Sequence, residues 1–403
     1  MNKLKNLLLT LSVLLLCSLF LDRVLKTAGF PAHFPVAHLP NHQERIKQLE
    51  MEYDFATNSQ GLRYREIPLK KPIGNRRIFV VGDSFTEGAG VEANEIFTTL
   101  LEKSFTDTES DINFINAGLR GAGPLQYARI FLHLGLKYQP DGLLICLYAN
   151  DVTDMPEYLT PKDFKLRPRL LTRREKLLYN LYPRMVVMWK KFQRSRHQSR
   201  ANPEFVELVS EHALSIGKSP EAIATWKASL PANLVMAVQK GEFTGAYLSY
   251  GLLKPHYWSD ALDIDTPRAE RKWHSLAITL EKITSIAKQQ GIEAAIVYLP
   301  AVFQYNVDAY RSTNPRIATG MIYRQHWLTE QTEAQKRLAA WCRQRRVPFL
   351  DLTATFRQAA IKNKQLNWDL DIHWRPAGHR VAATEIERWI KEQRVFRFLD
   401  TGF

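Results

Sequence analysis

A serine, a histidine and an aspartate in this 403-residue chain have the types and positions that acyl transfer through a covalent intermediate requires. Ser84 ends a Gly-Asp-Ser turn that follows a short apolar run, and Asp371 precedes His373 by two residues just before the last helical pattern. In this chemistry a base takes the serine proton and a carboxylate orients the base. We therefore predict Ser84 as nucleophile, His373 as general base and Asp371 as the orienting acid, with Asp369 as the alternative acid.

The same chemistry needs hydrogen-bond donors for the oxyanion that forms on the reacting carbonyl. The candidates are the backbone N–H groups of Ser84 and Gly121 and the side-chain amide of Asn150. Each piece alone has an ordinary explanation as a turn, a cap or a packing residue. Their chain order, and their common position after successive apolar runs, favour a single site.

The elements that must position these residues alternate along the chain. Short apolar runs predict strands at 77–81, 112–115, 143–148, 294–299 and 347–352, and patterns with apolar positions at three- and four-residue spacing predict helices at 95–105, 125–137, 268–290, 329–345 and 376–393. Such strands joined by helices are typical of a parallel sheet covered on both faces, with ligands bound beyond the carboxyl ends of the strands. We expect an α/β fold, a three-layer α/β/α sandwich with a five-stranded parallel sheet.

The beginning of the chain predicts a targeting segment. The sixteen residues from Asn6 to Leu21 carry no charge, and Lys3 and Lys5 precede them. This pattern favours an uncleaved transmembrane helix with the remaining chain outside the cytoplasm. A cleaved signal peptide and a buried or interfacial helix are the alternatives, although no small-x-small cleavage site follows the run.

The predicted organisation has five parts: an N-terminal signal anchor at 1–26, a linker at 27–49, the first part of the α/β domain at 50–154, a mainly helical basic insertion at 155–265, and the second part of the α/β domain at 266–403. Three cysteines with this spacing fit no disulfide framework and no zinc motif. His379 is predicted to pack inside the last helix rather than to bind a metal. We predict no cofactor and no metal ion.

The positive charge of the chain is local. Residues 161–200 carry +11 of the formal net charge of +14, so the remainder is nearly neutral. Together with the targeting segment and the lack of a recognisable recognition module, this argues against nucleic-acid binding. Three interpretations of residues 161–200 stay open: a solvated basic face, a surface for anionic membrane lipids, and a groove for an acidic polysaccharide.

Four stretches of the sequence resemble the motifs of the SGNH/GDSL hydrolases: Gly82-Asp83-Ser84, the turn through Gly121, Asn150-Asp151 and Asp371-Ile372-His373. The resemblance covers residues 50–154 and 290–395 and implies the flavodoxin-like fold of that family and action on esters. Stretches 57–63 and 77–88 are similar to a membrane-anchored bacterial branch, which implies a single-pass inner-membrane protein with its catalytic domain in the periplasm or outside the cell. Tyr148 departs from the glycine that is common in the family, so we expect a narrower acyl pocket.

The Asp-x-His-Trp spacing at 371–374 is similar to that of the branch containing alginate O-acetylation proteins. This resemblance implies an acylated envelope or extracellular carbohydrate as substrate. Three functions stay open: a serine acyl esterase acting on O-acyl groups, a carbohydrate O-acetyltransferase with the same triad, and a non-catalytic glycan-binding or assembly subunit. The sequence identifies no protein partner.

Overall fold

The computed structural model describes residues 2–27, 36–106, 112–165, 178–179, 181–186, 188–189, 201–310, 320–362 and 365–399. One parallel sheet contains five strands, β3 (Arg76–Gly82), β4 (Ile112–Gly118), β5 (Gly142–Tyr148), β6 (Glu293–Leu299) and β7 (Phe349–Asp351). Their order, β4-β3-β5-β6-β7, is the flavodoxin-like order of doubly wound sheets. The predicted α/β fold with a five-stranded parallel sheet is confirmed.

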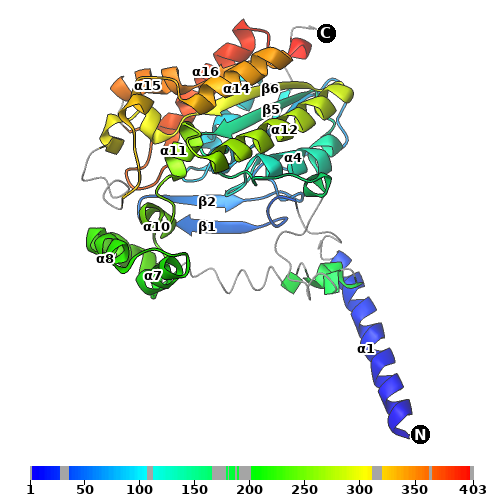
Figure 1. Ribbon diagram of the computed structural model, residues 1–403. Coiled ribbons are helices and arrows are strands. Elements are labelled where there is room, and N and C mark those ends of the chain that lie inside the picture. The colour runs from blue at the N-terminus through cyan, green and yellow to red at the C-terminus, as the bar shows by residue number, and fades with distance from the viewer. Residues whose placement is uncertain are drawn as a thin grey trace.

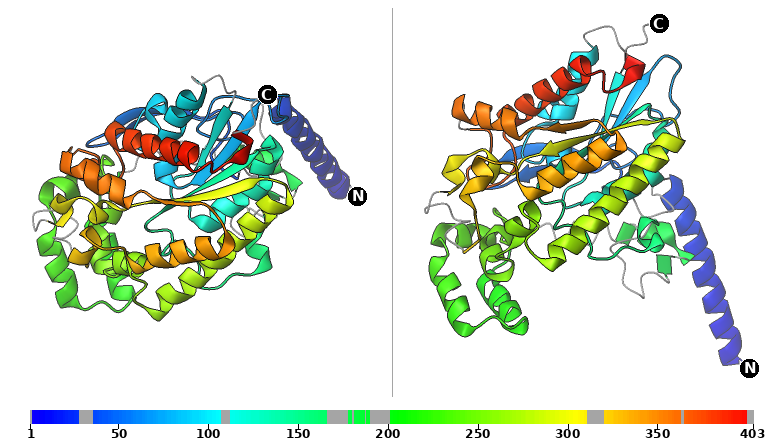
Figure 2. Two further views of the ribbon diagram at one scale, coloured as in Figure 1. Left: turned by 90° about the horizontal axis from the view of Figure 1, so that it is seen from above. Right: turned by 45° about the horizontal axis from the view of Figure 1, so that its top comes forward.

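Helices cover the two faces of this sheet (Figures 1 and 2). Helices α3 (Phe97–Thr106) and α16 (Pro376–Glu392) pack together, and α4 (Pro124–His133) packs with α12 (Pro267–Gln289). Helix α14 (Glu333–Arg345) contacts β7, and α15 (Thr353–Lys362) contacts α16. Every residue of β4 and β5 is buried, which explains why β5 is almost continuously apolar and why β4 is apolar except at Asn113 and Asn116.

A small antiparallel hairpin lies outside the main sheet and beside α10 (Figure 1). Its strands, β1 (Gln43–Lys47) and β2 (Glu52–Ala56), pair from Gln43↔Ala56 to Lys47↔Glu52. Residues 43–49 of the predicted 27–49 linker therefore belong to this hairpin and its turn. The hairpin is stable because Ile46, Met51, Tyr53 and Phe55 form an apolar cluster of their own, yet β1 offers only one buried apolar residue as a sequence signal.

The described end of the insertion is helical. It contains α7 (Phe205–Ser215), α8 (Pro220–Ser229), α9 (Ala232–Lys240), α10 (Ala246–Leu253) and α11 (Tyr257–Leu262). A second apolar cluster, built around residues such as Phe205, Trp226 and Leu234, holds α7 to α10 together. Most of the basic stretch falls at residues 166–177, 180, 187 and 190–200, outside the described residues, so its three interpretations stay predictions.

Residues Asn2–Thr27 form helix α1, which projects from the body of the molecule (Figure 1). Asp22 of α1 pairs with Arg184 at 2.7 Å. No helix in the described part of the chain is both long enough and apolar enough to cross a membrane, so the structure does not support the predicted transmembrane helix at 1–26.

Candidate active site

The nucleophile candidate stands at the carboxyl end of β3, an inner strand of the sheet. Ser84 begins α2 (Ser84–Glu87), a four-residue helix that follows β3 after a single residue, Asp83. The Asp83 carboxylate accepts a hydrogen bond from the N–H of Phe85 at 2.9 Å and so caps this helix. The Ser84 side chain is held in a tight, hydrogen-bonded turn instead of a mobile loop.

Two glycines allow α2 to lie directly on the strand ends. A Cβ atom on Gly82 would come within 2.1 Å of Thr86 Oγ1, and one on Gly118 would come within 2.1 Å of the backbone nitrogen of Glu87. Both approaches are far below van der Waals contact, so only glycine fits. The Gly-Asp-Ser turn therefore owes its first residue to packing.

The base and acid candidates lie on a loop between α15 and α16. The N–H of Trp368 donates to the carbonyl of His373 at 3.1 Å, and the N–H of Arg375 donates to the carbonyl of Leu366 at 2.9 Å. These bonds close the base of the loop like a hairpin, and the fully buried ring of Trp374 anchors it in the core. We call residues 366–375 the catalytic loop.

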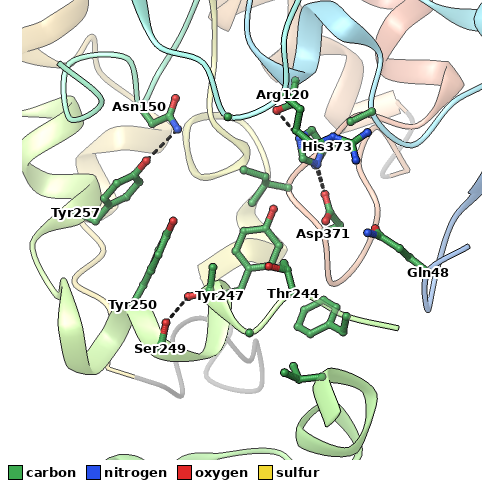
Figure 3. A pocket seen from close by; sticks show the side chains of 18 of the residues that line it. Gln48, Arg120, Asn150, Thr244, Tyr247, Ser249, Tyr250, Tyr257, Asp371 and His373 are labelled. Carbon is green, nitrogen blue, oxygen red and sulfur yellow. Dashed lines mark hydrogen bonds and ion pairs between the residues drawn. The ribbon is translucent and has the colours of Figure 1, made fainter. Parts of the chain in front are cut away.

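The structure brings the three triad candidates together. His373 Nε2 lies 2.7 Å from Ser84 Oγ, and His373 Nδ1 is hydrogen-bonded to Asp371 Oδ1 (Figure 3). The same carboxylate oxygen accepts the backbone N–H of His373 at 2.9 Å, which fixes the acid relative to the ring. The alternative acid, Asp369, has a 79% exposed side chain and pairs with Arg375 at 3.2 Å. This arrangement can move the Ser84 proton to the imidazole.

The three oxyanion candidates, Ser84, Gly121 and Asn150, line one cavity. Gly121 has φ +68, and a Cβ atom there would meet no heavy atom within 4 Å. The left-handed backbone of the turn therefore explains this glycine better than lack of space does. Asn150 Nδ2 donates to the hydroxyl of Tyr257 at 2.9 Å (Figure 3). An amide nitrogen carries two N–H bonds, so the bond to Tyr257 leaves the second N–H as a candidate oxyanion donor.

Tyr257 of the insertion fixes the orientation of the Asn150 amide. Its hydroxyl accepts from Asn150 and donates to Asp154 Oδ1 at 3.3 Å. Burial raises the pKa of Tyr257 well above 10, so the hydroxyl keeps the proton that it donates. Tyr257 belongs to the aromatic stretch 255–258, whose sequence gives no signal that separates this role from core packing.

The glycine-rich turn at 119–121 is attached to α2 by a buried ion pair. Glu87, which is fully buried, accepts the N–H of Arg120 at 2.9 Å and pairs with the Arg120 guanidinium at 3.0 Å. His38 Nε2 lies 2.5 Å from Glu87 Oε1, the oxygen that also accepts the Arg120 N–H. Burial alone would raise the pKa of Glu87, but Arg120 and His38 outweigh it and lower this pKa to about 2. The ion pair keeps Gly121 beside the nucleophile helix.

Two carboxyl groups are buried beneath the nucleophile turn. Burial raises the pKa of Asp83 and also that of Asp151, and each of the two is raised further by neighbouring carboxylates that include Asp154. Asp151 accepts hydrogen bonds from the Tyr127 hydroxyl at 2.9 Å and the Tyr148 N–H at 3.0 Å. Asp151 therefore has a structural role: it holds the end of β5, next to Asn150, through these hydrogen bonds.

His379, the other histidine near the catalytic loop, belongs to the core. It is 1% exposed, and its Nδ1 accepts the N–H of Phe97 at 3.4 Å. Burial lowers the pKa of His379 to about 3, so the ring is neutral. Within the described ranges, no group of three or more His, Cys, Asp or Glu side chains could hold a metal ion.

A cavity of about 610 Å³ lies over Ser84. The strand ends and the catalytic loop form one wall, and the insertion forms the facing wall with Thr244, Tyr247, Ser249, Tyr250 and Tyr257 (Figure 3). Among the described residues of 161–200, none lines the cavity. No sequence pattern indicates that the insertion faces the triad candidates, because this proximity arises only from tertiary packing.

Tyr148 also lines the cavity, but its ring is 1% exposed. It stacks on Phe85 with ring centroids 3.9 Å apart and meets Trp258 edge-on at 6.1 Å. The tyrosine therefore packs largely into the core behind the nucleophile. Whether it narrows the acyl pocket stays a prediction.

Comparisons with known proteins find only solved structures of low sequence identity and low TM-score. No family model matches the sequence, and no protein with a curated description matches it. Similar solved structures include TesA (12% identity, TM-score 0.38, 78% of this chain and 98% of that chain), a member of the lipolytic G-D-S-L family from Veillonella parvula (12%, 0.34, 79% and 99%), and Axe2, an acetylxylan esterase from Geobacillus stearothermophilus (12%, 0.37, 79% and 95%). At this level the similarity assigns no activity and no residue role to the chain.

Proposed function

We propose that the protein is a serine acyl esterase of the SGNH/GDSL type. The observation that carries the proposal is the continuous contact from Ser84 through His373 to Asp371, placed at the wall of a cavity large enough for a ligand. Such a chain of contacts is needed for turnover and is not needed by a subunit that only binds glycan. The esterase is therefore favoured over the non-catalytic alternative.

The residues can divide the reaction as follows. His373 Nε2 takes the proton as Ser84 Oγ attacks the acyl carbon, while Asp371 holds the Nδ1–H and stabilises the imidazolium. Donors from Ser84, Gly121 and Asn150 stabilise the oxyanion of the tetrahedral intermediate. When this intermediate collapses, the leaving alcohol receives the proton from His373. Water then attacks the acyl-enzyme, with His373 as base, and releases the acid.

We propose an acylated carbohydrate as the substrate. The insertion wall combines tyrosine rings with the hydroxyl groups of Thr244, Ser249, Tyr247 and Tyr250. Aromatic faces suit the C–H faces of a sugar ring, and hydroxyl groups can donate to and accept from sugar hydroxyls. The described residues of the basic stretch do not line the cavity, so its interpretation as a groove for an acidic polysaccharide stays a prediction.

A carbohydrate O-acetyltransferase is the second candidate. Its support is the size of the cavity, since about 610 Å³ exceeds what an acetyl group alone needs and can hold an acceptor sugar beside Ser84. The same triad would form the acyl-enzyme, and a sugar hydroxyl would replace water in the second step. Acetate release and acetyl transfer to added oligosaccharide, measured in one reaction, distinguish the two.

The test of the esterase uses p-nitrophenyl acetate and a fluorophosphonate probe. Wild-type protein should release nitrophenol and be labelled at Ser84, while Ser84→Ala and His373→Ala should lose at least about 10³-fold in kcat. Ser285→Ala, on the surface of α12, is the matched control and should retain activity. If folded wild-type protein neither turns over nor labels but binds glycan, the non-catalytic alternative replaces the proposal.

We further propose that the catalytic part acts outside the cytoplasm, supported by the sequence order at the N-terminus, where Lys3 and Lys5 precede a charge-free run from Asn6 to Leu21. Fusing a reporter that is active only outside the cytoplasm after residue 403 tests this. An inactive, cytoplasmic fusion would contradict export.

A further inference from the structure

The tip of the catalytic loop is held from outside the loop. Its base is closed by backbone pairing of Trp368 with His373, but residues 369–371 lie beyond this pairing. Asp371 stands within this tip, so the position of its carboxylate depends on what holds the three backbone N–H groups there. A backbone donor without an acceptor is costly when buried, and loose donors leave a loop mobile.

One side chain holds all three. Glu50 Oε1 accepts the N–H of Asp369 at 3.1 Å, and Glu50 Oε2 accepts the N–H groups of Leu370 at 2.7 Å and Asp371 at 3.0 Å. Hydrogen bonds from backbone N–H to a carboxylate are stronger than those between neutral groups. The carboxylate thereby fixes the backbone immediately before the His373 partner.

Glu50 is itself held by the hairpin turn. The N–H of Gln48 donates to the carbonyl of Met51 at 2.9 Å and closes the turn between β1 and β2. The N–H of Leu49 donates to the carbonyl of Glu242 at 2.9 Å, which attaches the turn to the insertion. Trp368 packs against the apolar cluster of the hairpin and gives the loop a second contact there. The hairpin is therefore a fixed support for the Glu50 carboxylate.

The charges around Glu50 make this placement specific. Burial raises the pKa of Glu50, and the carboxylates of Asp369 and Asp371 raise it further, while the N–H groups of Leu370 and Asp371 lower it. A carboxylate beside two others is unfavourable unless donors compensate it, and backbone N–H groups are the donors present. A glutamate that stabilised only the hairpin would have no reason to lie beside the carboxylates of Asp369 and Asp371.

We propose that Glu50 is a positioning residue of the active site, which acts on Ser84 and His373 by fixing the Asp371 segment. The proposal rests on the proposed esterase function for its kinetic tests. Glu50 touches no reacting atom, and its effect passes through the Asp371–His373 contact. Removing it should let Asp371 move relative to the imidazole, and displacements of about 1 Å in such geometry cost about 100-fold in rate.

The kinetic test compares Glu50→Ala and Glu50→Gln with Glu52→Gln. Glu52 lies on the same hairpin but is 47% exposed and pairs with Arg45, so its variant should keep wild-type kcat. Glu50→Ala should lower kcat by about 30- to 100-fold with KM within about threefold. Glu50→Gln retains one acceptor oxygen, so its kcat should lie between those of the wild-type protein and Glu50→Ala. A kcat within threefold of wild type for folded Glu50→Ala would overturn the proposal.

A double-mutant cycle tests whether the effect passes through Asp371. If Glu50 acts by positioning Asp371, adding Glu50→Ala to Asp371→Asn should lower kcat by less than about threefold relative to Asp371→Asn alone, because the interaction that Glu50 positions is already lost. Losses that multiply in full would show that Glu50 supports the fold independently of the triad and would overturn the proposal.

A spectroscopic readout separates this proposal from the esterase proposal. The Nδ1–H proton of His373, hydrogen-bonded to Asp371, should give a downfield proton resonance that His373→Ala removes. Glu50→Ala should shift or broaden this resonance, and Glu52→Gln should leave it unchanged. This result would support the positioning role even if the wild-type protein hydrolysed no ester, whereas an unchanged resonance in Glu50→Ala would contradict it.

Discussion

Replacing Glu87 by glutamine removes the buried charge that joins the nucleophile helix to the glycine-rich turn. Glu87 is 0% exposed and is contacted by Arg120 and His38, so the loss of its charge leaves Arg120 without its anionic partner. Glutamine keeps the size of the side chain and can still accept the N–H of Arg120 through its carbonyl oxygen. The substitution therefore tests the charge more than the shape.

The lowered pKa gives the magnitude. The pKa of Glu87 falls from an ordinary value of 4.5 to about 2, and each unit corresponds to about 1.36 kcal/mol, so the ionised form stabilises the fold by about 3 kcal/mol at pH 7. Because the folded-state pKa is the lower one, this contribution is complete above pH 4.5 and declines as the pH falls toward 2. Removing one partner of a buried ion pair typically costs ~3–5 kcal/mol of stability, which agrees with this value.

The assay is urea unfolding followed by tryptophan fluorescence at several pH values. Glu87→Gln should lower the free energy of unfolding by about 3 kcal/mol at pH 7, and its difference from wild type should shrink below pH 4.5. Glu392→Gln is the matched control, because Glu392 forms an exposed pair with Arg388 on α16 and such pairs contribute less than about 1 kcal/mol. Activity of folded Glu87→Gln should also drop, since the turn that carries Gly121 loses the ion pair that helps to hold it beside α2.

Two results would refute this reasoning. A loss below about 1 kcal/mol at pH 7 would mean that the ion pair offsets little more than its own desolvation. A difference from wild type that stays constant between pH 7 and pH 3.5 would mean that the side chain contributes through packing rather than through ionisation.

The remaining predictions concern the walls of the site. Tyr257→Phe should lower kcat on p-nitrophenyl acetate by about 10-fold with little change in melting temperature, because it frees the Asn150 amide to rotate; an unchanged kcat would show that this amide needs no support. Gly118→Ala should abolish soluble, active protein, since the added Cβ would meet the α2 backbone. Gly121→Ala should cost about 1–2 kcal/mol of stability because of its left-handed backbone. A variant with the unfolding midpoint of the wild-type protein would contradict the prediction made for it. Asp369→Asn should keep activity within about twofold, because its side chain is exposed.

The fold and the triad follow from patterns that are local in the sequence. Strands buried on both faces are largely apolar, so their positions were predictable, and Ser84 and Asn150 follow β3 and β5 at one edge of the sheet. His373 was expected directly after the last strand, but helix α15, which no pattern predicted, lies between β7 and its loop. Asp371 was selected over Asp369 from its two-residue spacing alone, and the structure places it, and not Asp369, against the imidazole.

The supports of the site could not be predicted in the same way. Glu50 is a charged residue in a polar turn, and its partners are backbone N–H groups, which carry no side-chain signature in a sequence. In the sequence, Tyr257 cannot be distinguished from an ordinary core tyrosine; only the structure shows that its hydroxyl is hydrogen-bonded to Asn150. Strand β1 has one buried apolar residue, too few for period-two alternation to distinguish it from a linker.

The distances along the chain between the parts of the site have a consequence for the timing of synthesis. His373 follows Ser84 by 289 residues, and Leu370 follows Glu50 by 320. A ribosome exposes the N-terminal parts first, and contacts between remote segments wait until the later segment has emerged. The nascent chain therefore carries its serine without its base until residue 373 has emerged from the ribosome, and the proposed attack on esters has to wait for that point.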